Sequence, residues 1–251
     1  MIPNKVLNDC IEREKAGTDY VCPTEDKSTL LEMLDEINTE CTTNMKYLAE
    51  LDAFHVIGAG KIIVKYIDRF SSESVRAYLI PQLLLDKIRD CDRLILRMYL
   101  HFRESSEYIS APGNPSPSHI CTRYDNAFHK LKSKRIVEDL LNILSSPRDA
   151  FYLPLTVKML ASWKVPELEQ ILLKYLDSDA VSMRDIGLCE DGQTYFPSFA
   201  YICRELKFTA MNGLRYYPSE KAVDAICMYV SDIDKDIRLL ANKIYKKISV
   251  R

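Results

Sequence analysis

The sequence predicts an all-α protein, an α-solenoid built from antiparallel helix pairs. Three observations predict this fold class. Apolar residues recur at steps of three and four through nearly every segment, which is the spacing of one helix face. Glycine occurs only 7 times in 251 residues, which disfavours the many tight turns of a β-protein. The C-terminal half also matches itself after a shift of 54 residues, as expected for stacked repeats.

The N-terminal region, 1–104, is predicted to hold a divergent set of helices. The first is predicted as one long helix over Ser28–Phe54, because apolar residues from Leu30 to Leu51 fall on a single face. A proline inside a helical pattern opens a new turn or kinks the helix, so we expect Pro81 to do one or the other. The remaining helices are predicted over 58–70, from Glu73 onward, and over 91–102.

Helical periodicity stops at Ser105–Ser118, which contains three prolines, one glycine and five serines. Such a segment is too poor in apolar residues to pack by itself, so we interpret it as a loop or linker. The predicted organisation is an N-terminal helical region over 1–104, a linker over 105–118 and a repeat region over 119–251. One continuous solenoid, with 105–118 as an excursion, is the alternative.

Four more helices are predicted after this linker. Ser146-Pro147 has the pattern of a serine cap followed by proline in the first turn, so a helix is expected from there to Trp163. Pro166 opens the next, which extends to Leu176. The other two are predicted over 122–132 and 134–144.

The internal match aligns 158–187 with 212–241 without gaps, and apolar positions fall on apolar positions. Within it, Asp232-Ile-Asp-Lys-Asp-Ile-Arg238-Leu-Leu-Ala241 has an acidic turn, an apolar-arginine pair and a small residue three positions on. Asp177–Gly187 has nearly the same pattern. These residues resemble the HEAT-repeat family, most clearly over 147–251. The resemblance implies two-helix units that stack side by side.

Composition limits the function. The formal net charge is −2, whereas a general nucleic-acid binder has a marked basic excess. The N-terminus has no secretory signal pattern, and no window approaches a membrane span, so we expect a cytoplasmic protein without a membrane partner. The eight cysteines include no Cys-x-x-Cys pair, and most are interpreted as small buried residues in a reducing compartment.

No motif in the sequence carries recognisable catalytic chemistry. Gly58-Ala-Gly-Lys61 resembles part of a phosphate loop, but Ile62 follows the lysine, so a helix start is favoured. His119, Cys121 and His129 lack the spacing of a metal site. We therefore assign no catalytic residue, metal or cofactor; an enzyme is left open, and a non-catalytic protein is favoured.

The sequence favours a protein-binding module, such as a scaffold, an adaptor, or an inhibitor or immunity protein. Aromatic side chains dominate interface hot spots, and an acidic pair in a loop can meet a basic partner. The candidate contact residues are Trp163, Glu190, Asp191, Tyr195, Phe196, Phe199, Tyr216 and Tyr217. Alkylpurine DNA glycosylases also use HEAT-like helices, so a nucleic-acid-binding protein or DNA glycosylase is the alternative.

Overall fold

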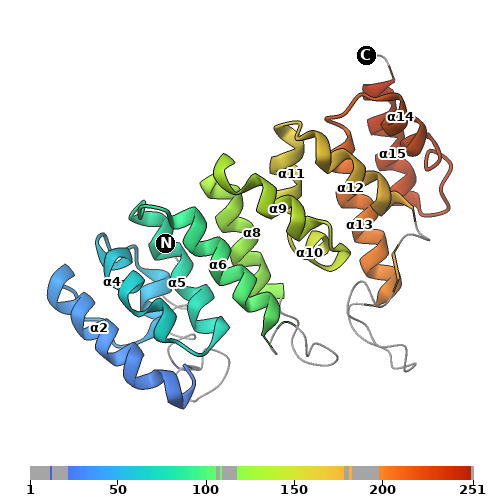
Figure 1. The fold of residues 1–251 in the computed structure, drawn as a ribbon. Helices are drawn as coiled ribbons and strands as arrows, with labels where there is room; N and C mark the ends of the chain where they lie inside the picture. Colours follow the sequence, from blue (N-terminus) through green and yellow to red (C-terminus); the bar gives the residue numbers. More distant parts are fainter. Residues whose placement is uncertain are drawn as a thin grey trace. The chain divides into compact units, whose positions relative to one another are not determined.

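The computed structural model describes residues 12, 22–105, 108, 118–177, 181–182 and 198–249. These residues form thirteen α-helices and no strand, which confirms the predicted all-α class (Figure 1). The chain forms two compact units, unit 1 (Met1–Tyr108) and unit 2 (Ile109–Arg251). The division falls inside the proline- and serine-rich segment 105–118. None of the described helices is long and apolar enough to cross a membrane.

Unit 1 contains five described α-helices, and helix α5 is at their centre. Helices α3, α4 and α6 all contact α5, and α2 packs on α4. The helices are α2 (Lys27–Cys41), α3 (Leu48–Ala53), α4 (Ala59–Tyr66), α5 (Glu73–Leu85) and α6 (Cys91–Glu104), with short 3-10 turns at Thr24–Asp26 and Ile67–Arg69.

The long helix predicted over 28–54 is in fact two helices, and that prediction was wrong. Helix α2 ends after Cys41 because Thr42 takes a left-handed conformation with φ of 54°. Asn38 then holds the turn, since its Oδ1 accepts the Met45 amide at 2.7 Å and its Nδ2 donates to the Met45 carbonyl at 2.8 Å. An asparagine side chain here replaces helical backbone bonds, a break that apolar spacing does not reveal.

Helix α4 begins where the phosphate-loop-like segment lies. Asp86, at the end of α5, accepts the Gly58 amide at 2.9 Å and the Gly60 amide at 2.6 Å. A carboxylate is favourable at a helix N-terminus, where amide groups lack helical partners. The segment Gly58–Lys61 is therefore a helix start, as predicted, and its amides are bound by the protein's own carboxylate.

Pro81 lies inside α5, which continues from Glu73 to Leu85. The next residue, Gln82, is fully buried, and its side chain forms hydrogen bonds with the backbone at the end of α3 and in the loop that follows. Its Nε2 donates to the carbonyls of Leu51 and Phe54, and its Oε1 accepts the Val56 amide. Pro81 is thus neither the start of a new helix nor its end, and the adjacent Gln82 satisfies polar backbone that would otherwise be buried without partners.

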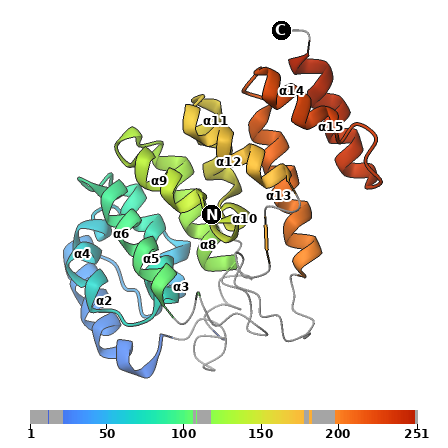
Figure 2. The same cartoon turned by 45° about the vertical axis from the view of Figure 1, so that its right-hand side comes forward.

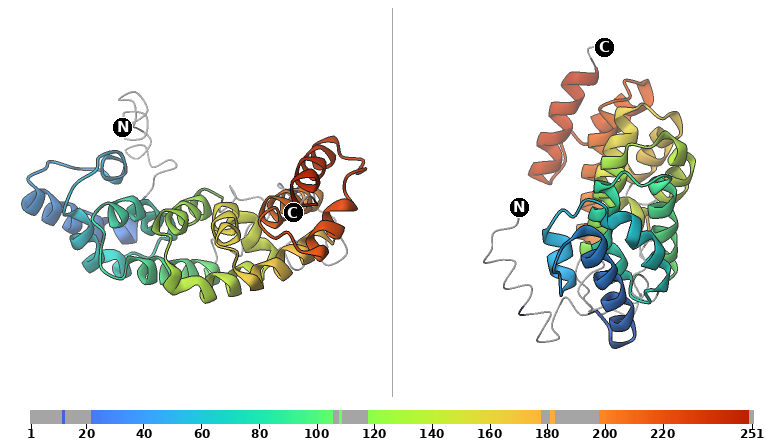
Figure 3. Two further views of the ribbon diagram at one scale, coloured as in Figure 1. Left: turned by 90° about the horizontal axis from the view of Figure 1, so that it is seen from above. Right: turned by 90° about the vertical axis from the view of Figure 1, so that its left-hand side faces the viewer.

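Unit 2 contains eight described helices, whose contacts fall into two rows. One row follows α8, α11, α13 and α15, and the other follows α9, α12 and α14. Figures 2 and 3 show these helices following one another from green to red. The helices are α8 (Ser118–Leu131), α9 (Val137–Leu144), α10 (Pro147–Tyr152), α11 (Pro154–Ser162), α12 (Pro166–Leu176), α13 (Phe199–Leu214), α14 (Glu220–Cys227) and α15 (Lys235–Ile248).

The helix predicted from Pro147 to Trp163 is also two helices, and that prediction was wrong. Leu153 separates α10 from α11 with φ of −119° and ψ of 47°, outside the helical region. Pro154 then takes the first position of α11. A residue before proline is pushed out of the helical conformation, so Pro154 itself causes the break.

The start of α11 is capped by a buried carboxylate from α8. Asp125 is 3 % exposed and accepts the Leu155 amide at 2.9 Å, the Thr156 amide at 2.8 Å and the Thr156 hydroxyl at 2.7 Å. Burial raises the pKa of Asp125 to about 6, against the opposing effect of the three donors. The carboxyl group is therefore mostly ionised at pH 7.

One hydrogen bond recurs at the 54-residue spacing of the internal sequence match. Tyr175 donates its hydroxyl to the carbonyl of Leu144, the last residue of α9. Tyr229, 54 positions later, donates its hydroxyl to the carbonyl of Leu176, the last residue of α12. In both places a tyrosine hydroxyl binds the carbonyl at the end of an earlier helix.

Small residues lie where the helices of unit 2 approach closely. Gly213 and Ala210 of α13 are buried, as is Ala241 of α15. A Cβ atom on Gly213 would lie 2.5 Å from Leu172 Cδ1 on α12. Small side chains at these positions permit the helices to pack closely.

The substitution Ala241→Phe is expected to lower the free energy of unfolding of unit 2 by about 1–3 kcal/mol, because the site is fully packed. Leu239→Phe is the matched control, since Leu239 lies on the same helix but is 58 % exposed. Urea unfolding followed by circular dichroism measures both. An unchanged midpoint for Ala241→Phe would contradict the packing assigned to α15.

The acidic turn before α15 caps that helix. Asp234 Oδ1 accepts the amides of Asp236 at 2.8 Å and Ile237 at 3.2 Å. Its Oδ2 accepts Arg204 Nε of α13 at 2.7 Å. The Arg204 hydrogen bond is the main reason that the pKa of Asp234 falls to about 2, and the two amides act in the same direction.

This lowered pKa predicts an acid-dependent loss of stability. The native state favours ionised Asp234, so its contribution is fully present above about pH 4 and is lost as the pH falls towards 2. We expect wild type to be more stable than Asp234→Asn by a constant amount from pH 7 to about 4.5, and by less towards pH 2. Thermal unfolding with Asp224→Asn, an exposed position on α14, as control tests this. A difference that stays constant to pH 2 would contradict it.

Candidate functional site

Two turns of unit 2 bring part of the predicted contact set together. The turn between α11 and α12 carries Trp163, and the turn between α13 and α14 carries Tyr216 and Tyr217. The two turns touch, because the Tyr217 hydroxyl donates to the Val165 carbonyl at 2.7 Å. Trp163 and Tyr216 are both half-buried, so each retains surface that a partner can contact.

Tyr217 cannot serve as the exposed anchor that the sequence suggested. Its side chain is 6 % exposed, and burial raises the pKa of its phenol. The ring packs inside unit 2 and its hydroxyl is already used by Val165. Tyr217 therefore links the turn after α13 to the turn after α11, and a partner protein cannot reach its side chain.

Phe199 lies apart from these turns. It is the first residue of α13, whereas Tyr216 follows the end of the same helix. A helix of 16 residues is about 24 Å long, so Phe199 and Tyr216 are at opposite ends of unit 2's longest helix. The candidates Glu190, Asp191, Tyr195 and Phe196 lie outside the described residues.

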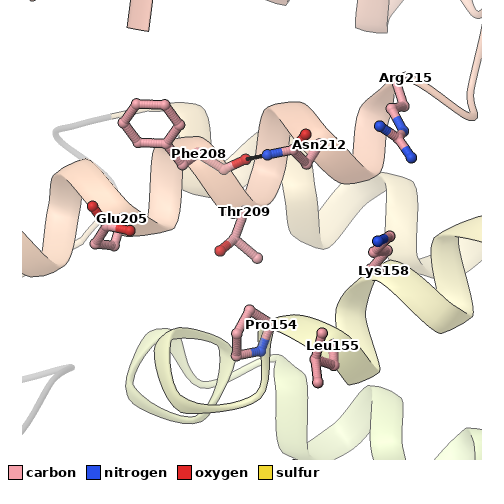
Figure 4. Close-up of a pocket in the computed structure, with 8 residues that line it drawn as sticks. All are labelled: Pro154, Leu155, Lys158, Glu205, Phe208, Thr209, Asn212 and Arg215. Carbon is pink, nitrogen blue, oxygen red and sulfur yellow. Dashed lines mark hydrogen bonds between the residues drawn. The ribbon is translucent and has the colours of Figure 1, made fainter. Parts of the chain in front are cut away.

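The structure adds a groove between α11 and α13 that the sequence did not predict. Its volume is about 410 Å³, and both helices contribute side chains to it (Figure 4). We call this cavity the α11–α13 groove. It is lined by Pro154, Leu155, Lys158, Glu205, Phe208, Thr209, Asn212 and Arg215.

The α11–α13 groove has charges of opposite sign at its two ends. Glu205 lies at one end near Phe208, and Lys158 and Arg215 lie at the other (Figure 4). The guanidinium of Arg204 lies 4.8 Å from the centroid of the Phe208 ring and pairs with Glu205 at 3.2 Å. Leu155 and Thr209 lie between the two ends (Figure 4). Opposite charges at the two ends favour one orientation of a bound polypeptide segment.

Tyr216 adjoins the basic end of the groove. Its hydroxyl accepts Arg215 Nη2 at 2.7 Å, and this hydrogen bond is the main reason that its phenol pKa is lowered. The charges of Arg215, Lys158 and Lys247 lower the pKa further. Tyr216, a predicted contact residue, therefore lies in a locally positive environment next to the groove.

The signal for this groove was present in the sequence but weak. Glu205, Phe208, Thr209, Asn212 and Arg215 recur at three- and four-residue steps along α13, on a stripe separate from its buried face. Such a stripe looks like an ordinary solvated helix face until a second helix is placed beside it. The tertiary packing of α11 on α13 is what turns it into a groove.

Unit 1 holds one arrangement with acid–base character. Glu73 is 1 % exposed, and its Oε1 lies 2.6 Å from His101 Nδ1 and 2.9 Å from Arg76 Nη1. A carboxylate that orients a histidine occurs in hydrolases, where the histidine activates a nucleophile. Here the three side chains join the start of α5 to α6, and we assign them a structural role. Among the described residues, no group of three or more acidic, histidine or cysteine side chains could hold a metal ion.

Comparisons with known proteins give no independent assignment of this site. The α11–α13 groove and the adjoining Tyr216 therefore rest on the geometry of unit 2 alone. No model of a protein family, no curated protein and no solved structure matches this chain.

Proposed function

We propose that this protein is a non-catalytic protein–protein interaction module, of the scaffold, adaptor or inhibitor and immunity type. In this proposal unit 2 is a HEAT-like solenoid, a stack of helix pairs whose surface binds another protein. Each pair buries one face against its neighbours and leaves the other available. The proposal includes no membrane partner, cofactor or metal.

Two observations support the stacked arrangement. The first is the pair of rows, α8–α11–α13–α15 and α9–α12–α14, in which each helix contacts the next member of its row. The second is the recurring hydroxyl bond of Tyr175 and Tyr229 to the end of the preceding helix. A bond that recurs with the repeat is expected where successive units pack in the same way.

The observation that carries the binding function is the α11–α13 groove. It lies between neighbours in one row, is about 410 Å³ in volume and combines Phe208 and Leu155 with charged ends. Ligand sites in proteins are typically concave, with an apolar lining and a few placed polar groups. A groove of this size fits a short segment of a partner chain.

A cytoplasmic location is part of the proposal. Cys91 and Cys121 are buried thiols. Burial raises the pKa of Cys91 to about 11 and raises that of Cys121 well above its usual value. Buried, unreactive thiols suit a reducing compartment, where such side chains act as small apolar residues.

Nucleic-acid binding, including DNA glycosylase activity, is the alternative. It would use Lys158 and Arg215 as phosphate contacts. A strand of nucleic acid needs cations along its whole path, whereas Glu205 lies in the same groove. We therefore favour a protein partner.

Filling the groove tests the proposal. Thr209→Trp places a large side chain between α11 and α13, and we expect it to abolish capture of the partner in affinity purification from the native cell. Gln170→Trp, at an exposed position of α12, is the matched control and should capture as wild type does. Circular dichroism verifies that both variants are folded.

Two results would count against this proposal. If wild type, Thr209→Trp and Gln170→Trp capture the same partners equally well, the groove is not the binding site. A labelled DNA duplex that wild type shifts at about 50 mM salt, and Thr209→Trp does not, would favour the nucleic-acid alternative.

A further inference from the structure

The basic end of the α11–α13 groove contains two cations. Lys158 on α11 and Arg215, which directly follows α13, point toward one another across the groove (Figure 4). Among the described residues, neither forms an ion pair with a carboxylate. Two facing cations repel each other unless an anion lies between them.

Arg215 also has a donor that the described part of the chain does not satisfy. Its Nε is buried and has no hydrogen-bond acceptor there, while Nη2 donates to the Tyr216 hydroxyl at 2.7 Å. Most buried donors in folded proteins are paired, so the hydrogen bonding of this guanidinium is incomplete among the described residues. The guanidinium is held in place by Tyr216, through the hydroxyl bond and through its position 4.8 Å from the centroid of the ring.

A third cation strengthens the positive field at this end. Lys247 of α15 acts on Tyr216 together with Lys158 and Arg215, and the three charges lower the phenol pKa in addition to the Arg215 hydrogen bond. Three helices therefore contribute positive charge to one place. Such convergence raises the affinity for an anionic group beyond that of one exposed lysine.

We propose that Lys158 and Arg215 bind the side-chain carboxylate of an aspartate or glutamate in an extended segment of the partner protein. This inference rests on the proposed function and names the chemistry of the partner. Leu155, between the two ends of the groove, contacts an apolar side chain of the same segment (Figure 4). Glu205 at the far end, which pairs with Arg204 on one oxygen, accepts a backbone N–H of the segment.

The length of the groove sets the spacing of these features. Arg215 follows Glu205 by ten residues, which is about 15 Å along a helix. An extended chain rises about 3.3 Å per residue, so about four or five residues span this distance. The expected recognition sequence has an apolar residue between an acidic residue and, about four positions from the acid, a basic or neutral residue.

Selection from a displayed library of random nine-residue peptides tests this inference on the full chain. Peptides are selected on wild type and counter-selected on Thr209→Trp, so that only groove binders are retained. We expect these peptides to share an aspartate or glutamate on one side of an apolar residue. A synthetic peptide of the selected sequence should bind about tenfold more tightly than its asparagine or glutamine counterpart.

Reversing the charge of Lys158 tests whether this residue binds the acidic group of the peptide. Lys158→Glu should weaken the selected acidic peptide by about tenfold and strengthen the same peptide with lysine in place of its acid. Lys158 is exposed, so this variant is expected to fold. Lys174→Glu makes the same change in net charge at an exposed position of α12 and should leave binding unchanged.

The outcomes separate this inference from the proposed function. The carboxylate site is wrong if the groove-dependent peptides show no preference for an acidic residue, or if that preference persists in Lys158→Glu. In either case the proposed binding function would still stand. If wild type selects nothing beyond Thr209→Trp, the groove is not a peptide site and both proposals fail. Displacement of a selected peptide by duplex DNA, with no acidic preference, would instead assign the two cations to phosphate.

Discussion

Replacing Asp125 with alanine is expected to lower the free energy of unfolding of unit 2 by about 3 kcal/mol. The substitution leaves two amides and one hydroxyl, those of Leu155 and Thr156, without their buried acceptor. It also removes the negative charge at the start of α11. Trp163 is the chain's single tryptophan and directly follows α11, so its fluorescence during urea unfolding measures the loss.

Two variants control this experiment. Asp224→Ala removes an exposed carboxylate of α14 and should change stability by less than about 0.5 kcal/mol. Asp125→Asn keeps one oxygen acceptor and should fall between wild type and Asp125→Ala. Equal midpoints for Asp125→Ala and Asp224→Ala would show that the buried cap does not stabilise α11.

The substitution Gly60→Ala is expected to destabilise unit 1 by about 2 kcal/mol. A Cβ atom at this position would lie 2.8 Å from Asp86 Oδ2 and 2.9 Å from the Gln82 carbonyl oxygen. Neither can withdraw easily, because Asp86 binds the Gly60 amide and the Gln82 carbonyl belongs to α5. Hydrogen exchange of peptides from 48–85 measures this effect within unit 1, and we expect faster exchange there.

Gly213→Ala is the matched control for this prediction. The three atoms nearest to its Cβ would all belong to the Leu172 side chain on α12, which can change its rotamer. We therefore expect a smaller loss of stability, confined to unit 2. A larger loss of stability for Gly213→Ala than for Gly60→Ala would contradict our explanation, in which contact with rigid backbone determines how much stability is lost.

The sequence predicted some helices closely and missed two breaks. Helix α12 begins at Pro166 and ends at Leu176, as expected, because proline marks its first turn and the apolar pattern stops with it. The break between α2 and α3 was missed because the side chain of Asn38, rather than a proline or glycine, closes the turn. The break at Leu153 had a visible cause, Pro154, to which the prediction gave too little weight.

The candidate site was predicted less well than the fold. Aromatic residues were singled out by type, but burial decides which of them a partner can reach. Tyr217 is used inside unit 2, whereas Tyr216, the adjacent residue, lies next to the groove. Lys158 and Arg215 are 57 positions apart in sequence, and no spacing rule connects them.

The sequence by itself determined the helical class of this protein and the bounds of helices such as α12. These features follow from local periodicity and from the positions of prolines, which each segment carries independently of its neighbours. Only the tertiary structure decided which carboxylate caps which helix, which tyrosine is buried and where a groove forms. Those depend on distances between residues far apart in the chain, which are fixed when α11 packs on α13 and α5 packs on α4.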